Sequence, residues 1–237
     1  MKNAIYYVLS ALFFFTNCTL NAQFGKKGNG NIVKTERNVE SFTGIDVGGS
    51  VHLTIKQGDQ QKVEVETDEN LQESIKTSID GQTLKISTES RIRSTESIKV
   101  FLTVKDLKYI AASGATEIKS NGQIIAGNIE INLSGASEIK LDVKAIELKI
   151  DASGGADADI RGAVGYLFIN SSGGSDINAH ELTAAKAEAN ASGGSDIYIN
   201  VQDELKAIAS GGADIKYKGT ANLIKAESSG GANITKE

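Results

Sequence analysis

The 237-residue sequence contains no Pro, no Trp and a single Cys, and its aromatic residues are limited to six Tyr and seven Phe. So few aromatic side chains disfavour an aromatic-lined pocket, which is the usual site for a small molecule. Without Pro, every residue keeps the backbone N–H group that an inner strand of a sheet must donate. An enzyme with a carved pocket is therefore not the expected class.

Positive charge is also scarce, with 25 Lys and Arg against 30 Asp and Glu and a net charge of −5. No basic field is available to attract phosphate backbones, so we expect no nucleic-acid partner. Glycine is abundant, with 25 residues in a chain that is 40% apolar. This composition is sufficient for a buried core and is typical of repeated tight turns.

Residues 1–22 have the features of a cleaved secretory signal: a positive charge near the start, an apolar run, and the small residue Ala22 at the end. The run is shorter than the roughly 20 residues that a spanning helix needs. We therefore expect an exported chain with no membrane span after cleavage, located in the periplasm, at the cell surface or outside the cell. In the alternative, Cys18 is the lipid-bearing first residue of a lipoprotein, although Asn17 stands where a small residue is preferred.

The second half of the chain repeats one phrase, Ser-Gly-(Gly/Ala)-x-(Asp/Glu)-Ile, seven times. The copies begin at Ser113, Ser134, Ser153, Ser172, Ser192, Ser210 and Ser229. Their spacings are 21, 19, 19, 20, 18 and 19 residues, a regularity that indicates a solenoid. In the third copy, Ala158 stands where Ile is expected and Ile160 follows two places later, which predicts a small bulge there.

Between these corners, apolar and polar residues alternate with period two, which is strand patterning. The apolar positions include Ile139, Leu141, Val143, Ile146, Leu148 and Ile150. Each unit of about 19 residues is predicted to hold two short strands and two turns, and to stack on the next unit about 4.8 Å away. The predicted fold is all-β: a single-stranded parallel β-helix (β-solenoid) of about seven rungs, with Gly at corners that need a positive φ and no Cβ.

The chain after residue 22 divides into a leading segment and a solenoid domain with two parts. Residues 23–36 are rich in Gly and Lys and are predicted to be flexible. The solenoid domain spans 37–237, with irregular coils at 37–110 that cap its amino end and the repeat rungs at 111–237. No comparable cap follows the last corner, and an exposed rung can pair with another chain. We therefore expect the C-terminal rung to be a contact for homo-oligomers.

The opening segment 37–47, with Phe-x-Gly-Ile at Phe42, continues through 51–58, 69–71 and 84–86. Together with the corner repeats, it resembles the family described as "putative auto-transporter adhesin, head GIN domain", over about residues 37–235. The resemblance implies a secreted, all-β, right-handed helical module common in Bacteroidetes-type bacteria. Its name implies adhesion, and it implies little chemistry.

An acidic residue follows each corner, and stacking would align these residues in a ladder. The ladder is Glu117, Glu138, Asp157, Asp176, Asp196, Asp214 and finally Asn233. Like charges 4.8 Å apart repel by about 0.9 kcal/mol in water, so the ladder must be solvated, partly protonated or bridged by cations. Calcium ligation by Asp157, Asp176, Asp196 and Asp214 is the alternative to a solvated ladder. Calcium-binding solenoids repeat about every nine residues, so we expect the solvated ladder, with no metal and no cofactor.

The remaining candidates for chemistry are isolated. His52 and His180 have no second His or Cys at ligand spacing and are expected to be surface residues. No Ser lies in a nucleophile-elbow context, and the repeat accounts for nearly every carboxylate, so we expect no catalytic residues. Polysaccharide-acting enzymes also use β-helices, and a glycoside-cleaving carboxylate pair is the alternative.

Tyr198 aligns with Lys140 and should face outward, where it is a candidate glycan contact, whereas Tyr217 aligns with Leu141 and should face inward. The sequence as a whole predicts a non-enzymatic solenoid that is secreted or held at the cell envelope and acts as an adhesin or surface scaffold. Its partner is a surface ligand, either glycan or protein. A carbohydrate-binding module is the alternative function.

Overall fold

The computed structural model describes residues 25–89 and 92–237. The predicted signal segment 1–22, with Cys18, lies outside the described residues. No helix in the described ranges combines the length and the apolar character needed to cross a membrane.

The described chain is almost entirely β-strand. Its elements are β1 Lys26–Lys27, β2 Ile32–Glu36, β3 Gly44–Gly49, β4 Val51–Gln57, β5 Lys62–Asp68, the 3-10 helix η1 Glu69–Ser74, β6 Ile75–Asp80, β7 Thr83–Thr88, β8 Ile92–Arg93, β9 Ile98–Val104, β10 Tyr109–Gly114, β11 Glu117–Leu133, β12 Glu138–Ala152, β13 Asp157–Ser171, β14 Asp176–Gly193, β15 Asp196–Gly211, β16 Asp214–Lys218, β17 Asn222–Gly230 and β18 Asn233–Lys236.

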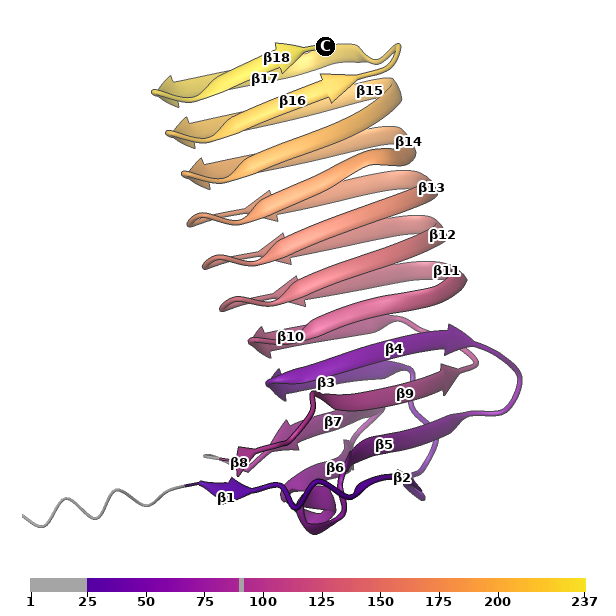
Figure 1. Cartoon of the computed structure of the whole chain (residues 1–237). Coiled ribbons are helices and arrows are strands. Elements are labelled where there is room, and N and C mark those ends of the chain that lie inside the picture. Colours follow the sequence, from indigo (N-terminus) through magenta and orange to yellow (C-terminus); the bar gives the residue numbers. More distant parts are fainter. Residues whose placement is uncertain (1–24, 90–91) are drawn as a thin grey trace, which may run out of the picture.

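Successive coils lie on one another along a single axis (Figure 1). From β10 onward every neighbouring pair is parallel: β10 with β11, each of β11 to β14 with the next, β15 with β16 and β17, and β16 with β18. The corner repeats therefore form a parallel β-solenoid, as the spacing predicts.

The coil itself differs from the expected two strands and two turns. Strand β12 runs for 15 residues without a break, and β11 to β15 curve smoothly at mid-coil, so these coils are interrupted at the Ser-Gly corner alone (Figure 1). The last coil also has a break at mid-coil, between β16 and β17. The uneven repeat spacing is absorbed at mid-coil irregularities, such as those between Lys119 and Gln123 and between Asp159 and Gly162. The irregularity predicted at Ala158 and Ile160 lies just after Ala158: Ala158 is buried and pairs with Ile139 and Ile177, and the register between β13 and β14 then shifts between Asp159 and Gly162.

The first Gly of each corner has a left-handed φ, between +74° and +81°. At Gly173, an added Cβ would lie 2.8 Å from the carbonyl oxygen of Gly154 on the preceding coil, closer than packed atoms tolerate. The second corner position is roomier, since a Cβ at Gly174 would lie 3.9 Å from the same oxygen. This explains why Ala115 takes that second position in the first copy.

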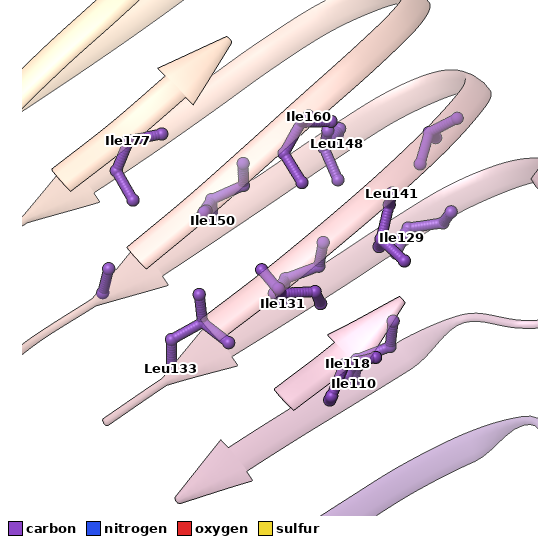
Figure 2. Packing of buried hydrophobic residues seen from close by; sticks show 14 of the residues in the cluster. Ile110, Ile118, Ile129, Ile131, Leu133, Leu141, Leu148, Ile150, Ile160 and Ile177 are labelled. Atoms are coloured by element: carbon purple, nitrogen blue, oxygen red, sulfur yellow. The ribbon is translucent and has the colours of Figure 1, made fainter. Parts of the chain in front are cut away.

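Branched aliphatic side chains from the two halves of each coil meet in the interior (Figure 2). Ile118 and Ile139 are fully buried there, and Tyr217 is 7% exposed, as its predicted inward direction requires. Ile146 differs: it is 71% exposed, because it falls between two register pairs at the mid-coil bend and turns outward. The alternation of buried positions changes phase at that bend, between Val143 and Leu148, and Ile146 lies within the change.

The amino-terminal coils continue the same sheets, as expected: β3 pairs in parallel with β10, and β4 with β11. They also contain antiparallel pairs, β2 with β5, β5 with β9 and β6 with β7. The segment 23–36 differs from the flexible chain that its composition predicts, because β1 pairs with β8 and β2 with β5.

A buried carboxylate holds this cap together. Asp68 is 0% exposed and accepts hydrogen bonds from the Gly30 N–H (2.7 Å), the Ser94 hydroxyl (2.6 Å), and the Thr95 N–H (2.8 Å) and hydroxyl (2.7 Å). Burial acts to raise the pKa of Asp68, but these hydrogen bonds outweigh it and lower the pKa below its usual range. The carboxylate thus fastens the chain before β2 to the loop before β9.

Candidate functional site

A groove of about 730 Å³ runs along the solenoid on the sheet half that ends at the Ser-Gly corner. It crosses seven successive strands, β3, β10 and β11 to β15, a length of roughly 30 Å at the usual strand spacing. Two columns of outward side chains line it, one of Asn and Asp and one of Ser. The first column is Asp46, Asn132, Asp151, Asn170 and Asn190; the second is Ser113, Ser134, Ser153, Ser172, Ser192 and Ser210.

Strand geometry and register place these columns. Side chains alternate between the two faces of a strand, so in β11 and its corner Asn132 and Ser134 face outward while Leu133 is buried. Parallel pairing then sets Asn132 beside Asp151, and Asp151 beside Asn170. On the coils from β11 to β14 the same two outward groups recur about every 4.8 Å along the axis, whereas Ala111 on β10 and Ile208 on β15 take the Asn position.

The first column is hydrogen-bonded along its length. Asn170 Nδ2 donates to Asp151 Oδ1 at 2.6 Å, and Asn190 Nδ2 donates to Asn170 Oδ1 at 3.0 Å. Lys149 Nζ lies 2.7 Å from Asp151 Oδ2 and 3.0 Å from Glu130 Oε1. These hydrogen bonds, first to Asp151 and then to Glu130, raise the pKa of Lys149. The negative charge of Asp151 is thus matched within the wall.

The Ser column is bonded more loosely. The hydroxyls of Ser134, Ser153 and Ser172 each donate to a carbonyl of the preceding coil at 3.4 Å, near the long limit for such bonds. Each hydroxyl can rotate to donate or accept elsewhere. Ala112 and Ala152 lie between the columns, and their side chains are buried on the core side of the sheet.

The acidic ladder lies on the other side of the Gly corner. Its members stack in register from Glu117 to Asn233, one per coil, and all are partly or fully exposed. His52 Nδ1 lies 2.7 Å from Glu117 Oε2, and Asn233 Nδ2 donates to Asp214 Oδ1 at 2.9 Å. A column with one carboxylate per coil differs from a cation cage. Within 25–89 and 92–237, no three His, Cys, Asp or Glu side chains gather closely enough to hold a metal.

Tyr198 is partly exposed and faces outward, as predicted, but it lies after the corner in β15 and outside the groove. Lys216 Nζ lies 5.2 Å from the centre of its ring, and the His180 ring meets it edge-on at 6.5 Å. His180 Nε2 in turn lies 2.8 Å from Glu237 Oε2. Tyr198 is therefore enclosed by neighbours on its own face, and the structure does not bring it to the groove.

The groove was not predicted from the sequence. A signal was present, since an Asn or Asp stands two residues before the corner Ser in four successive copies, at Asn132, Asp151, Asn170 and Asn190. Polar residues are ordinary at outward positions of an alternating strand, so this signal did not stand out.

Solved structures of proteins from Bacteroides and Parabacteroides have the same fold. A "putative adhesin" from Bacteroides fragilis has a TM-score of 0.83 at 22% identity and covers 90% of this chain and 100% of its own. A "putative lipid binding protein" from Parabacteroides distasonis has a TM-score of 0.74 at 25% identity, covering 89% of this chain and 98% of its own. A "putative adhesin" from Parabacteroides merdae has a TM-score of 0.65 at 20% identity, covering 90% and 99%.

No curated protein matches the chain. A family model matches residues 41–221, which is most of the sequence and includes both the cap and the corner repeats. The chain therefore belongs to the family described as "putative auto-transporter adhesin, head GIN domain".

Proposed function

We propose that this protein is an exported, non-enzymatic adhesin that binds its surface ligand along the groove. The observation that carries the proposal is the groove itself, a continuous channel with the same polar groups on successive coils. The adhesin family name and the predicted signal at 1–22 support a location outside the cytoplasm. The same proposal covers how the protein is held at the cell envelope, for which a lipid on Cys18 is the alternative to secretion.

The scaffold suits binding because it is rigid before the ligand arrives. Parallel hydrogen bonds join every coil to the next, and the first column is held by its own amide bonds. Preorganised groups lose little conformational freedom when they bind. An array repeated over several coils also adds weak contacts along one extended ligand.

Lipid is the second candidate ligand, since the Parabacteroides distasonis structure is named a "putative lipid binding protein". The partly exposed Ala111 and Ile208 give the two ends of the groove an apolar character. The polar side chains of both walls favour a polar ligand instead, because a buried acyl chain would leave their donors and acceptors unpaired.

The proposal is tested by filling the groove. Labelled protein is applied to a panel of bacterial cells, host cells and mucin, and its retention is compared with that of Ser172→Trp. The matched control is Asp176→Trp, which puts the same side chain on the same coil but beyond the Gly corner. Retention that falls at least tenfold in Ser172→Trp and stays unchanged in Asp176→Trp supports the proposal. Equal retention by all three proteins, or retention by none of them on any surface, contradicts it.

A further inference from the structure

We infer that the groove binds a linear, uncharged glycan whose chain lies along the solenoid axis. This inference rests on the proposed function, in which the groove is the ligand site, and it names the chemical class of the ligand.

The charges at the groove favour a neutral ligand. The lining residues that the structure describes include two carboxylates, Asp46 and Asp151, and no Lys or Arg. Asp151 is already paired with Lys149 at 2.7 Å and accepts a bond from Asn170. An anionic polymer or a phosphate headgroup would find no free cation on these walls. A polycation would find little unmatched negative charge.

The hydrogen-bonding groups match hydroxyls. Amide side chains such as Asn132 and Asn190 both donate and accept, and so do the hydroxyls of Ser153 and Ser192. A sugar hydroxyl is likewise both donor and acceptor. It can therefore meet either wall without leaving a group unpaired, whereas a carboxylate or an ammonium ion satisfies one kind of partner alone.

The direction of the groove also suits a glycan better than a peptide. Extended peptides bind sheets by adding a strand to an open edge, through free backbone groups. Backbone groups along this groove are already used between coils, as in the bonds from Ser153 N–H to the Leu133 carbonyl and from Ser172 N–H to the Ala152 carbonyl, both 3.0 Å. The groove instead crosses the strands and offers equal polar groups about every 4.8 Å, which is of the order of one pyranose residue in an extended chain.

Aromatic side chains stand beside the Asn column. Tyr109 and Phe168 belong to the next outward column, which is in register from Tyr109 through Glu130 and Lys149 to Phe168. Both rings are partly exposed, and the Tyr109 hydroxyl lies 3.4 Å from Asn132 Nδ2. Such amphipathic rings combine an apolar face with a polar edge, and the apolar face of a pyranose packs well on them.

The inference is tested with neutral linear polysaccharides: arrayed glucans, mannans, galactans and xylans, followed by calorimetry on any that bind. The variant Asn170→Leu/Asn190→Leu keeps the number and branching of the side-chain heavy atoms and removes two amides, and Asp196→Asn, on the other side of the Gly corner, is the control. We expect the affinity to fall about tenfold or more in the double variant, since two hydrogen bonds are lost, and to be unchanged in the control. Melting temperatures check folding, and Ser153→Trp, which leaves the amide column intact, gives an independent block.

Two further arms separate this inference from the proposed function. Periodate, which cleaves sugar diols, is applied to the surface that retains the protein, and neutral and anionic phospholipid vesicles are tested as alternative ligands. Periodate-sensitive retention that Ser172→Trp abolishes supports the glycan. Three results would overturn the glycan inference: groove-dependent retention that resists periodate, groove-dependent vesicle binding, and glycan binding that the groove variants do not change. Where retention still depends on the groove, the groove remains a site for another ligand. Retention that ignores Ser172→Trp would overturn both.

Discussion

Asn170 Nδ2 lies 2.6 Å from Asp151 Oδ1, so two side chains 19 residues apart in sequence are bonded across adjacent coils. The same column continues with Asn190, whose amide donates to Asn170 at 3.0 Å. An amide suits this position because it accepts from one neighbour and donates to the other. A wall of the groove is therefore ordered by the fold before any ligand binds.

Replacing Asn170 by Asp tests this wall. The change removes the bond to Asp151 and sets two carboxylates side by side, so Asn170→Asp should destabilise the protein by about 2 kcal/mol at neutral pH, half from the bond and half from repulsion. Asn170→Ala, which loses the bond without adding charge, should lose about 1 kcal/mol. Urea unfolding at pH 7 and pH 3 measures both. Because protonation removes the repulsion, the two variants should converge at pH 3; a gap that persists there would contradict the account.

The two Gly residues of a corner should respond differently to a methyl group. Gly173→Ala places a Cβ 2.8 Å from the Gly154 carbonyl at a φ of +81°, and we expect a loss of about 2–3 kcal/mol from the left-handed backbone and the contact. Gly174→Ala has room, and Ala136 already stands at that corner position in another copy, so its stability should change by less than about 0.5 kcal/mol. Thermal unfolding of both variants measures this. Equal effects would show that the coils do not stack at the corner as described.

The Asp68 carboxylate should control the stability of the cap in a pH-dependent way. Its pKa is lowered in the folded state, so its contribution is fully present above the ordinary pKa of 3.8 and is lost as the pH falls toward the lower folded value. Asp68→Asn should destabilise the cap by about 2 kcal/mol at pH 7, because the new amide N–H groups would face the N–H and hydroxyl groups that donate to the carboxylate. This difference from the wild type should shrink below about pH 4.

Hydrogen exchange at β2 and at the loop before β9 measures that cap effect. Asp59→Asn, at an exposed loop position, is the matched control and should leave exchange unchanged. A difference between wild type and Asp68→Asn that stays constant from pH 7 to pH 3 would contradict the assigned role.

The acidic ladder should behave as a row of solvated like charges. Asn233 donates to Asp214 at the end of the row, which indicates how an amide relieves the repulsion. Asp196→Asn should therefore raise stability by a few tenths of a kcal/mol to about 1 kcal/mol at low salt, and NaCl should reduce that gain. Melting curves with and without millimolar CaCl₂ measure the alternative. A rise in the wild-type melting temperature with calcium that Asp196→Asn loses would establish a metal role instead.

Much of the fold could be predicted from the repeat. The Ser-Gly phrase predicted stacked corners because a left-handed residue without a Cβ is needed there, and the inward direction of Tyr217 followed from its register. The mid-coil bend was not predicted, although the alternation changes phase there: the buried positions of β12 run to Val143 and resume at Leu148. Ile146 was therefore expected inside and is exposed. The antiparallel pairing of the cap was also not predicted, because alternation does not encode strand direction.

Less of the candidate site could be predicted from the sequence. Outward positions of strands tolerate many polar residues, so the alternation does not single out Asn170 or Ser172, and concavity depends on how the sheet curves beside the corner. Tyr198 was predicted to be a candidate glycan contact because it is an outward aromatic residue, but no sequence pattern shows that Lys216 lies over its ring. Its role as a glycan contact stays a prediction.

The most direct test of the central claim is to map where a bound ligand protects the protein. Hydroxyl-radical footprinting of the protein on a surface that retains it should show protection of Tyr109 and Phe168, the reactive side chains beside the groove walls. Tyr198, which lies on the side of the corner that carries the acidic ladder, should stay reactive. Protection of Tyr198, with Tyr109 and Phe168 left reactive, would contradict the account.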